Sequence, residues 1–135
     1  MLQNETRIRV RYGETDRMGY LHHGSYPLYF EVGRTELLRQ LGLSYKEMED
    51  DGILLPVREM KIKYFLPALY DDEVIIKTYL KKFPAVKLDF EYEIYNQNDE
   101  LLCKAETSLV FVSAVTRKPV RMPIYFGELI KPYFY

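Results

Sequence analysis

The side chains best suited to chemistry lie in one short segment, residues 12–26. It contains the carboxylate of Asp16, the phenol of Tyr12 and the only two histidines of the chain, His22 and His23. A carboxylate close to the first amides of a helix can support hydrolysis of an activated acyl group, because the carboxylate attacks or activates water while the amides hold the oxyanion. We therefore expect Asp16, His23 and Tyr12 to be catalytic. The candidate oxyanion donors are the backbone amides at the predicted helix start, Gly24, Ser25 and Tyr26.

Each of these residues also has a structural interpretation. A loop aspartate before a helix is commonly a turn or cap residue. Consecutive histidines could suggest a metal site, but neighbouring residues in a helix or strand point in different directions, and zinc needs three or four ligands. Asp16 and Glu14 could supply oxygens, yet the chain has no third histidine and no second cysteine. No bound metal or other cofactor is therefore expected.

Other reactive or charged side chains occur along the chain. Cys103 lies among leucine and alanine residues and is interpreted as a small buried hydrophobe rather than a nucleophile. Glu31 and Arg34 are three residues apart in the predicted helix, which favours an ion pair between them. Basic residues in two stretches are candidates for binding the phosphates of a carrier such as coenzyme A, although such groups are usually only solvated. They are Lys61, Lys63, Arg117, Lys118 and Arg121.

The hydrophobic pattern predicts the elements that must position these side chains. Residues 7–12 alternate charged and apolar side chains, as a half-buried strand does. Ser25 is expected to cap a long helix ending at Gly42, and Ser44 with Glu47 predicts a capping box for a short second helix. Four more strands are predicted, at residues 57–64, 74–80, 86–95 and 101–113. A long helix followed by hairpin-linked strands implies an antiparallel sheet with the helix on one face, an α+β arrangement.

Length and composition limit the class of protein. With 135 residues, no repeats and no linker-like segment, the chain is expected to form one domain over residues 1–135. The net charge of -1 argues against a broad nucleic-acid surface, which needs excess positive charge. A single cysteine permits no intramolecular disulfide, the first residues do not resemble a signal peptide, and no apolar run is long enough to span a bilayer. These features predict a soluble, cytoplasmic protein without stable membrane insertion.

Several motifs together resemble those of the hotdog-fold acyl-CoA thioesterases. They are Tyr12-x-x-Thr15-Asp16-x-x-Gly19-x-x-x-His23-x-Ser25-Tyr26, Tyr29-Phe30-Glu31, Arg34-Thr35-Glu36, Tyr64-Phe65-x-Pro67-Ala68 and Asp71-Asp72. The motifs are most similar to the YbgC-like branch, which is related to 4-hydroxybenzoyl-CoA thioesterase, and they cover most of the chain. Two positions differ from the usual pattern of that branch: Glu14 replaces a common aspartate and His22 replaces a tyrosine.

The resemblance implies a hotdog fold, in which a five-stranded antiparallel sheet wraps around one long central helix. It also implies a homodimer or homotetramer with active sites at the subunit interface. The catalytic carboxylate, histidine and loop tyrosine of the family fall on Asp16, His23 and Tyr12. The implied activity is hydrolysis of an acyl-CoA thioester to a free acid and coenzyme A. Two alternatives remain open. One is a 3-hydroxyacyl-thioester dehydratase with His23 as base and Glu31 as acid, and the other is a non-catalytic acyl-thioester-binding or assembly protein.

Overall fold

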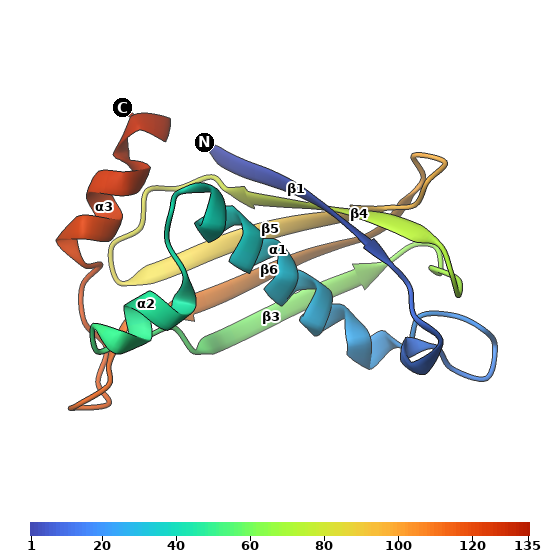
Figure 1. Ribbon diagram of the computed structural model, residues 1–135, viewed down its shortest axis with the longest axis horizontal. Helices are drawn as coiled ribbons and strands as arrows, with labels where there is room; N and C mark the ends of the chain where they lie inside the picture. The colour runs from blue at the N-terminus through green and yellow to red at the C-terminus, as the bar shows by residue number, and fades with distance from the viewer.

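The computed structural model describes residues 1–135, in which five strands form one antiparallel sheet. The strand order is β1-β4-β5-β6-β3, and one long helix, α1 (Tyr26–Gln40), lies across one face of the sheet (Figure 1). The strands are β1, Leu2–Arg9; β3, Val57–Tyr64; β4, Glu73–Leu80; β5, Lys87–Tyr95; and β6, Leu101–Val110. The predicted α+β arrangement, a five-stranded antiparallel sheet around one helix, is confirmed.

The two faces of the sheet differ because side chains alternate along each strand. On β4 and β5 every second residue is buried, including Ile76, Phe90 and Ile94. Apart from Ile75, the residues between them carry charges or phenols on the outer face. There, Tyr79 Oη donates a hydrogen bond to Glu93 Oε1 at 2.9 Å. The apolar core therefore lies between α1 and the sheet, and the outer face of the sheet is polar.

Helix α1 lies close to the sheet at Gly33. A Cβ atom added to Gly33 would lie 2.2 Å from Thr78 Oγ1 and 3.1 Å from Ile76 Cγ2, both on β4. A larger residue at this position would force the Thr78 and Ile76 side chains, the helix or the strand to shift. On either side of Gly33, Phe30 and Leu37 are fully buried against the sheet. This packing fixes where α1 begins, and with it the end of the loop that precedes the helix.

The first strand lies earlier in the chain than residues 7–12, where it was predicted. β1 starts at Leu2 because it pairs with the whole of β4, from Leu2 opposite Leu80 to Arg9 opposite Glu73. After Arg9 the chain leaves the sheet and forms a 3-10 turn at Tyr12–Glu14. Tyr12 consequently belongs to the loop and not to the strand.

The predicted last strand, residues 101–113, is interrupted at Phe111. Its side chain is fully buried, and β6 ends at the residue before it. The chain then forms β7, Val112–Ser113, which pairs with β2, Ile53–Leu54, in a separate two-stranded sheet. The hydrophobic pattern continues across the break because Val110, Phe111 and Val112 are all buried. The pattern of residues alone therefore did not reveal the change of strand partner.

A third helix, α3 (Ile124–Ile130), follows the strands and was not predicted. Its Phe126 and Ile130 are fully buried, and the Phe126 ring packs edge-on against Phe111 with 5.5 Å between centroids. Figure 1 shows α3 and the C-terminus at the end of the sheet opposite to the loop that precedes α1. None of the helices, α3 included, is both long and apolar enough to cross a membrane.

Ser25 stands immediately before α1, as predicted, but its side chain makes no capping hydrogen bond to the helix. The Ser25 backbone is already helical, and its hydroxyl donates a long hydrogen bond to the carbonyl of Glu14 at 3.5 Å. A 3-10 turn, His23–Ser25, precedes α1, and His22 caps this turn. Its Nδ1 accepts the N–H of Gly24 at 2.9 Å. The capping hydrogen bond before α1 is therefore made by the exposed imidazole of His22 and not by the hydroxyl of Ser25.

The short helix α2, Tyr45–Asp50, begins as predicted. Ser44 Oγ accepts the N–H of Glu47 at 3.1 Å and donates to the Glu47 carboxylate at 3.3 Å. This cap is local in sequence, which is why the pattern of residues was sufficient to find it.

The predicted ion pair between Glu31 and Arg34 does not form. Arg34 is only 6% exposed, and it donates from Nη1 to Tyr92 Oη at 3.0 Å and from Nε to Tyr45 Oη at 3.2 Å. A 2.6 Å hydrogen bond joins Tyr92 Oη to Thr107 Oγ1. We call Arg34, Tyr45, Tyr92 and Thr107 the Arg34 cluster. It links α1 to α2, β5 and β6, because a planar guanidinium can donate to several elements at once.

Candidate active site

The loop before α1 is attached by its backbone to the connection between β3 and β4. The N–H of Leu21 donates to the carbonyl of Ala68 at 2.8 Å, and the N–H of Tyr70 donates to the carbonyl of Gly19 at 3.1 Å. Gly19 has φ +77°, a left-handed conformation that glycine adopts without strain. These main-chain bonds attach the loop to the β3–β4 connection and help to set its path.

Asp16 has one carboxylate oxygen fixed and one free. Its Oδ1 accepts the N–H of Met18 at 2.9 Å and the N–H of Tyr20 at 3.2 Å, which orients the side chain within its own loop. Oδ2 has no hydrogen-bond partner within the chain, and the residue is only half-buried. Asp16 therefore has the structural role in a turn that the sequence analysis considered for it. It also leaves one oriented oxygen available to a substrate or a water molecule.

The two histidines stack on each other and have different partners. Their ring centroids are 4.3 Å apart. His22 Nδ1 accepts from Gly24, whereas the His23 imidazole forms no hydrogen bond within the chain. The backbone carbonyl of His23 accepts from the phenol of Tyr64 at 3.1 Å. The N–H of Ser25 donates to the carbonyl of His22 at 2.9 Å. The amides of Gly24 and Ser25, predicted as oxyanion donors, are thus already bonded within the chain.

Tyr12 lies in the same loop but does not contact Asp16 or His23 through a hydrogen bond. Its side chain is 78% exposed, and its ring packs edge-on against Tyr70 with 5.6 Å between centroids. The structure therefore places the three predicted catalytic residues in one loop without joining them to one another. No group of three histidine, cysteine, aspartate or glutamate side chains is arranged to hold a metal ion.

Glu14 is the organising residue of the loop, and the sequence analysis assigned it no such role. Its carboxylate is 12% exposed and accepts three hydrogen bonds, from Arg11 N–H (2.9 Å), Arg11 Nη2 (2.8 Å) and Tyr29 Oη (2.7 Å). Burial alone would raise the pKa of the Glu14 carboxyl, but these donors hold that pKa below its usual value. Its carbonyl accepts the N–H of His22 at 2.8 Å. The three-residue spacing of Arg11 and Glu14 hinted at their pairing, but the contact with Tyr29 depends on the fold.

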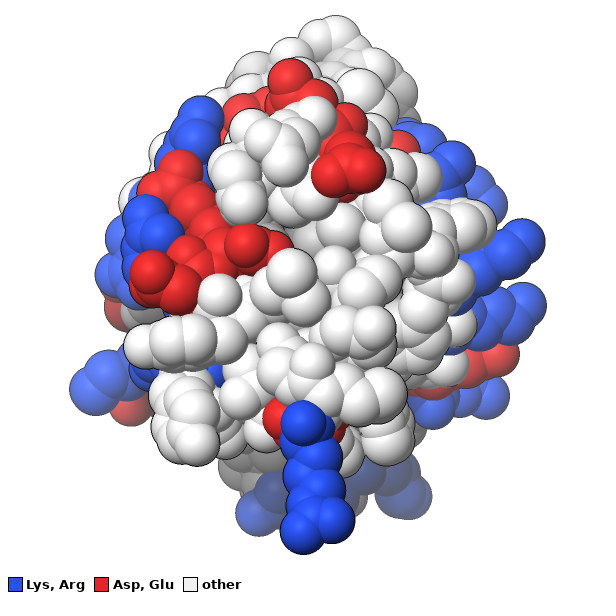
Figure 2. All heavy atoms as spheres, turned by 90° about the vertical axis from the view of Figure 1, so that its right-hand side faces the viewer, with Lys and Arg blue, Asp and Glu red and all other residues white.

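Exposed apolar and aromatic side chains surround the Asp16 loop. Figure 2 shows this end of the molecule as a largely uncharged surface with charged side chains at its margins. Met18 and Leu28 are 68% and 58% exposed, and no side chain of this chain covers them. The other members of this apolar patch are Tyr20, Tyr64, Phe65, Leu66, Leu69 and Tyr70. Exposed apolar side chains gathered at one end of a molecule are typical of a surface that binds a ligand or another chain.

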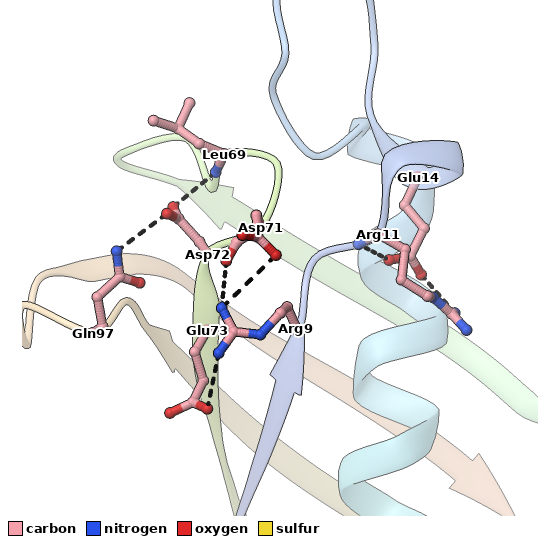
Figure 3. Close-up of polar contacts among 8 residues, drawn as sticks. All are labelled: Arg9, Arg11, Glu14, Leu69, Asp71, Asp72, Glu73 and Gln97. Atoms are coloured by element: carbon pink, nitrogen blue, oxygen red, sulfur yellow. Dashed lines mark hydrogen bonds and ion pairs between the residues drawn. The ribbon is translucent and has the colours of Figure 1, made fainter.

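The Asp71-Asp72 motif shapes the turn on which the loop rests (Figure 3). Asp72 Oδ2 accepts the N–H of Leu69 at 2.9 Å, and Asp72 Oδ1 accepts from Gln97 at 3.1 Å. Asp71 has φ +68°, and Arg9 Nη1 donates to its carbonyl at 2.7 Å. These contacts give the motif a structural role, because they hold the β3–β4 connection in position beside β1.

The five basic residues considered for phosphate binding are not gathered near Asp16. Lys61 and Lys63 lie on the outward face of β3, beside a groove of about 900 Å³ on the outer face of the sheet. Arg117, Lys118 and Arg121 lie in and after the turn that follows β7, at the far end of the molecule in Figure 1. No hydrogen bond or ion pair joins any of them to the Asp16 loop. Their role in binding coenzyme A stays a prediction.

The fold and the loop together define the class of protein. One antiparallel sheet around one long helix, with a carboxylate loop at the helix start, is the arrangement implied by the resemblance to hotdog-fold thioesterases. The chain matches the model of the Thioesterase-like superfamily over residues 10–130. The YneP protein of Bacillus subtilis is 37% identical over 125 residues, which are 93% of this chain and 91% of YneP.

Two further relatives carry names that state an activity. The acyl-CoA thioester hydrolase YbgC of Escherichia coli is 34% identical over 116 residues, 86% of this chain and 87% of that protein. The crystal structure of the DHNA-CoA thioesterase of Staphylococcus aureus superposes with a TM-score of 0.91 at 36% identity, covering 98% of this chain and 89% of that one. The chain therefore belongs to the thioesterase-like superfamily, which confirms the resemblance. The catalytic roles of Asp16, His23 and Tyr12 stay predictions.

Proposed function

We propose that this protein hydrolyses acyl-CoA thioesters to a free acid and coenzyme A, with Asp16 as the catalytic carboxylate. The observation that carries the proposal is the Asp16 side chain, oriented by two backbone N–H groups through Oδ1 and free at Oδ2. Family membership and the names of the relatives support the reaction class.

Asp16 can act by two routes that give the same products. As a nucleophile, Oδ2 attacks the thioester carbonyl carbon, the C–S bond breaks to release the coenzyme A thiolate, and water hydrolyses the resulting mixed anhydride. As a general base, Asp16 takes a proton from a water molecule that attacks the same carbon. A single turnover in ¹⁸O-labelled water separates the routes, because hydrolysis of the anhydride at the aspartyl carbon leaves label in Asp16.

The amides of Gly24, Ser25 and Tyr26 are proposed to stabilise the oxyanion. His22 Nδ1 holds the Gly24 N–H at 2.9 Å, so a thioester oxygen that uses this donor must replace the imidazole. His23 is proposed to orient the water or the substrate, because its imidazole has no hydrogen-bond partner within the chain. Tyr12 would hydrogen-bond to the substrate from its exposed position.

A homodimer or homotetramer, located in the cytoplasm, is part of the proposal. Strand β3 stands at one edge of the sheet. It ends at the exposed Tyr64, which is followed by Phe65; both belong to the apolar patch. A second copy against this edge would cover part of the patch and complete the acyl pocket. Arg117, Lys118 and Arg121 lie at the end of the molecule far from the Asp16 loop. We propose that these residues of the second copy bind the phosphates of the coenzyme A whose thioester lies at Asp16 of the first copy.

The acyl group is proposed to be apolar and to pack against the aromatic side chains of the patch. The Staphylococcus aureus relative is named for an aromatic substrate, DHNA-CoA, which makes aromatic acyl-CoA thioesters a natural part of a substrate panel. Short, medium and long aliphatic acyl-CoA thioesters form the rest of that panel.

The decisive experiment measures thiol release from this panel by the wild type and by Asp16→Asn. Asparagine keeps an oxygen that can accept from Met18 and Tyr20, so the loop geometry is preserved while the negative charge is lost. We expect turnover to fall by about 10²- to 10⁴-fold. Near-normal release by the variant would exclude Asp16 as the catalytic carboxylate. Formation of an unsaturated acyl-CoA without thiol would identify a dehydratase instead.

A further inference from the structure

The turn formed by His22 and His23 is held from two sides by residues to which the proposed reaction assigns no catalytic step. On one side, the carbonyl of Glu14 accepts the N–H of His22 at 2.8 Å. On the other side, the phenol of Tyr64 donates to the carbonyl of His23 at 3.1 Å. Glu14 belongs to the loop, whereas Tyr64 is the last residue of the edge strand β3. The two histidines are therefore tied to two separate parts of the fold.

Glu14 can hold the turn only because its own side chain is anchored. Its carboxylate accepts a hydrogen bond from the phenol of Tyr29, a residue of α1 that is 2% exposed. Arg11 supplies two more donors to the same carboxylate. Because α1 is packed against the sheet, the position of Tyr29 is fixed. Its hydrogen bond therefore restrains Glu14, whose carbonyl accepts the N–H of His22.

Tyr64 is anchored by packing. Its ring lies edge-on to the buried ring of Tyr26, with 5.0 Å between centroids. A tyrosine phenol already keeps its proton at neutral pH, and burial raises the pKa of Tyr64 and Tyr29 further, so both remain donors. Tyr64 is the first residue of the motif Tyr64-Phe65-x-Pro67-Ala68. Its hydroxyl has no partner within the chain other than the carbonyl of His23.

We propose that Glu14 and Tyr64 are positioning residues that clamp the His22–His23 turn and thereby fix the direction of the His23 imidazole. This inference deepens the proposed function and rests on it. His23 has no side-chain hydrogen bond of its own, so its direction depends on its backbone and on the stacked ring of His22. A catalytic group that is misplaced by a fraction of an ångström loses rate while substrate binding is retained.

The test removes single oxygen atoms. Tyr64→Phe deletes the donor to His23, and Tyr29→Phe deletes the helix anchor of Glu14; both keep the aromatic ring. Tyr79→Phe is the matched control, because it deletes a comparable tyrosine–carboxylate hydrogen bond, to Glu93, on the outer face of the sheet. We expect kcat to fall about tenfold in the first two variants with KM within about twofold of wild type, the loss expected for one hydrogen bond. Tyr79→Phe should leave both constants unchanged.

A second readout does not depend on activity. The chain contains only two histidines, so the imidazole region of its NMR spectrum consists of two sets of signals, assigned with His22→Gln and His23→Gln. Tyr64→Phe and Tyr29→Phe should shift or broaden the His23 signals, whereas Tyr79→Phe should not. A lower kcat with unchanged histidine signals would overturn the clamp, as would kinetic constants equal to those of the control.

The two proposals fail in different ways. If wild-type protein releases no thiol from any acyl-CoA, the proposed hydrolysis is wrong, and the histidine signals alone decide the clamp. If the His23 signals then move in Tyr64→Phe and Tyr29→Phe, the proposal that Glu14 and Tyr64 position His23 stands, whatever ligand the site binds. Signals that stay in place would overturn it.

Discussion

The Asp16 loop and the Arg34 cluster are both built from charged and phenolic side chains, yet they use them in opposite ways. In the Arg34 cluster, Arg34, Tyr92 and Thr107 are buried and bonded to one another. In the loop, Asp16 Oδ2 and the imidazole of His23 have no partner within the chain. The difference separates polar groups that hold the fold from polar groups that are available to a substrate.

The loop itself repeats this contrast on a smaller scale. Both oxygens of the Glu14 carboxylate accept hydrogen bonds, whereas Asp16, two residues later, has only one oxygen occupied. Two carboxylates in one short segment thus have distinct roles, and the contacts that distinguish them come from α1 and from Arg11. Residue type alone would not separate them.

The largest expected effect would come from Asp16→Asn. If the free oxygen of Asp16 is the reactive group, turnover falls by about 10²- to 10⁴-fold while the free energy of unfolding stays within about 0.5 kcal/mol of wild type. Urea unfolding followed by circular dichroism, beside the thiol-release assay, measures both quantities. A large loss of stability in this variant would mean that Asp16 holds the fold, as the Arg34 cluster does, and is not a group kept free for the substrate.

Tyr92→Phe should give the reverse pattern. The Tyr92 ring, stacked on Phe30 at 4.6 Å, is retained, but Arg34 Nη1 and Thr107 Oγ1 lose their common partner in a buried position. We expect the free energy of unfolding to fall by about 2 kcal/mol, with turnover per folded molecule unchanged. Urea unfolding against the Tyr79→Phe control checks this. Equal stability of the two variants would show that the cluster is not structurally important.

Acid should weaken the loop through protonation of Glu14. Because the folded-state pKa of Glu14 lies below its usual value, the unfolded chain binds the proton first, and stability present above the usual pKa is lost as the pH falls through the folded-state pKa. Wild type should therefore lose stability more steeply than Glu14→Gln between about pH 5 and about pH 3. Parallel slopes in urea midpoints would contradict the prediction.

Cys103 offers the smallest expected effect and a direct probe of the core. It was predicted to be a small buried hydrophobe, and the structure confirms full burial; burial also raises the pKa of its thiol to about 12. Iodoacetamide should leave the native protein unlabelled at neutral pH and label it fully in denaturant, because only the thiolate reacts. Mass spectrometry measures the extent of labelling. Rapid native labelling would mean that the core opens readily.

Local patterns in the sequence predicted a large part of the fold. The alternation along β3, β4 and β5 located three strands, and the Ser44 cap located α2. The predictions that failed depended on partners elsewhere in the chain. The start of β1 is set by its pairing with β4, the break at Phe111 by packing against α3, and the cap before α1 by the orientation of His22.

By itself, the sequence determined the chemistry that the protein can offer: two carboxylates, two histidines and the phenol of Tyr12 in a loop at a helix start. These residues are close in sequence, and loop and helix signals are local, so no tertiary information was needed to find them. Only the tertiary structure decided which carboxylate is free and which is occupied, and that Arg34 is buried rather than paired with Glu31. Those outcomes depend on side chains from distant segments, such as Tyr29 and Tyr92, whose directions are fixed only when the helix packs on the sheet.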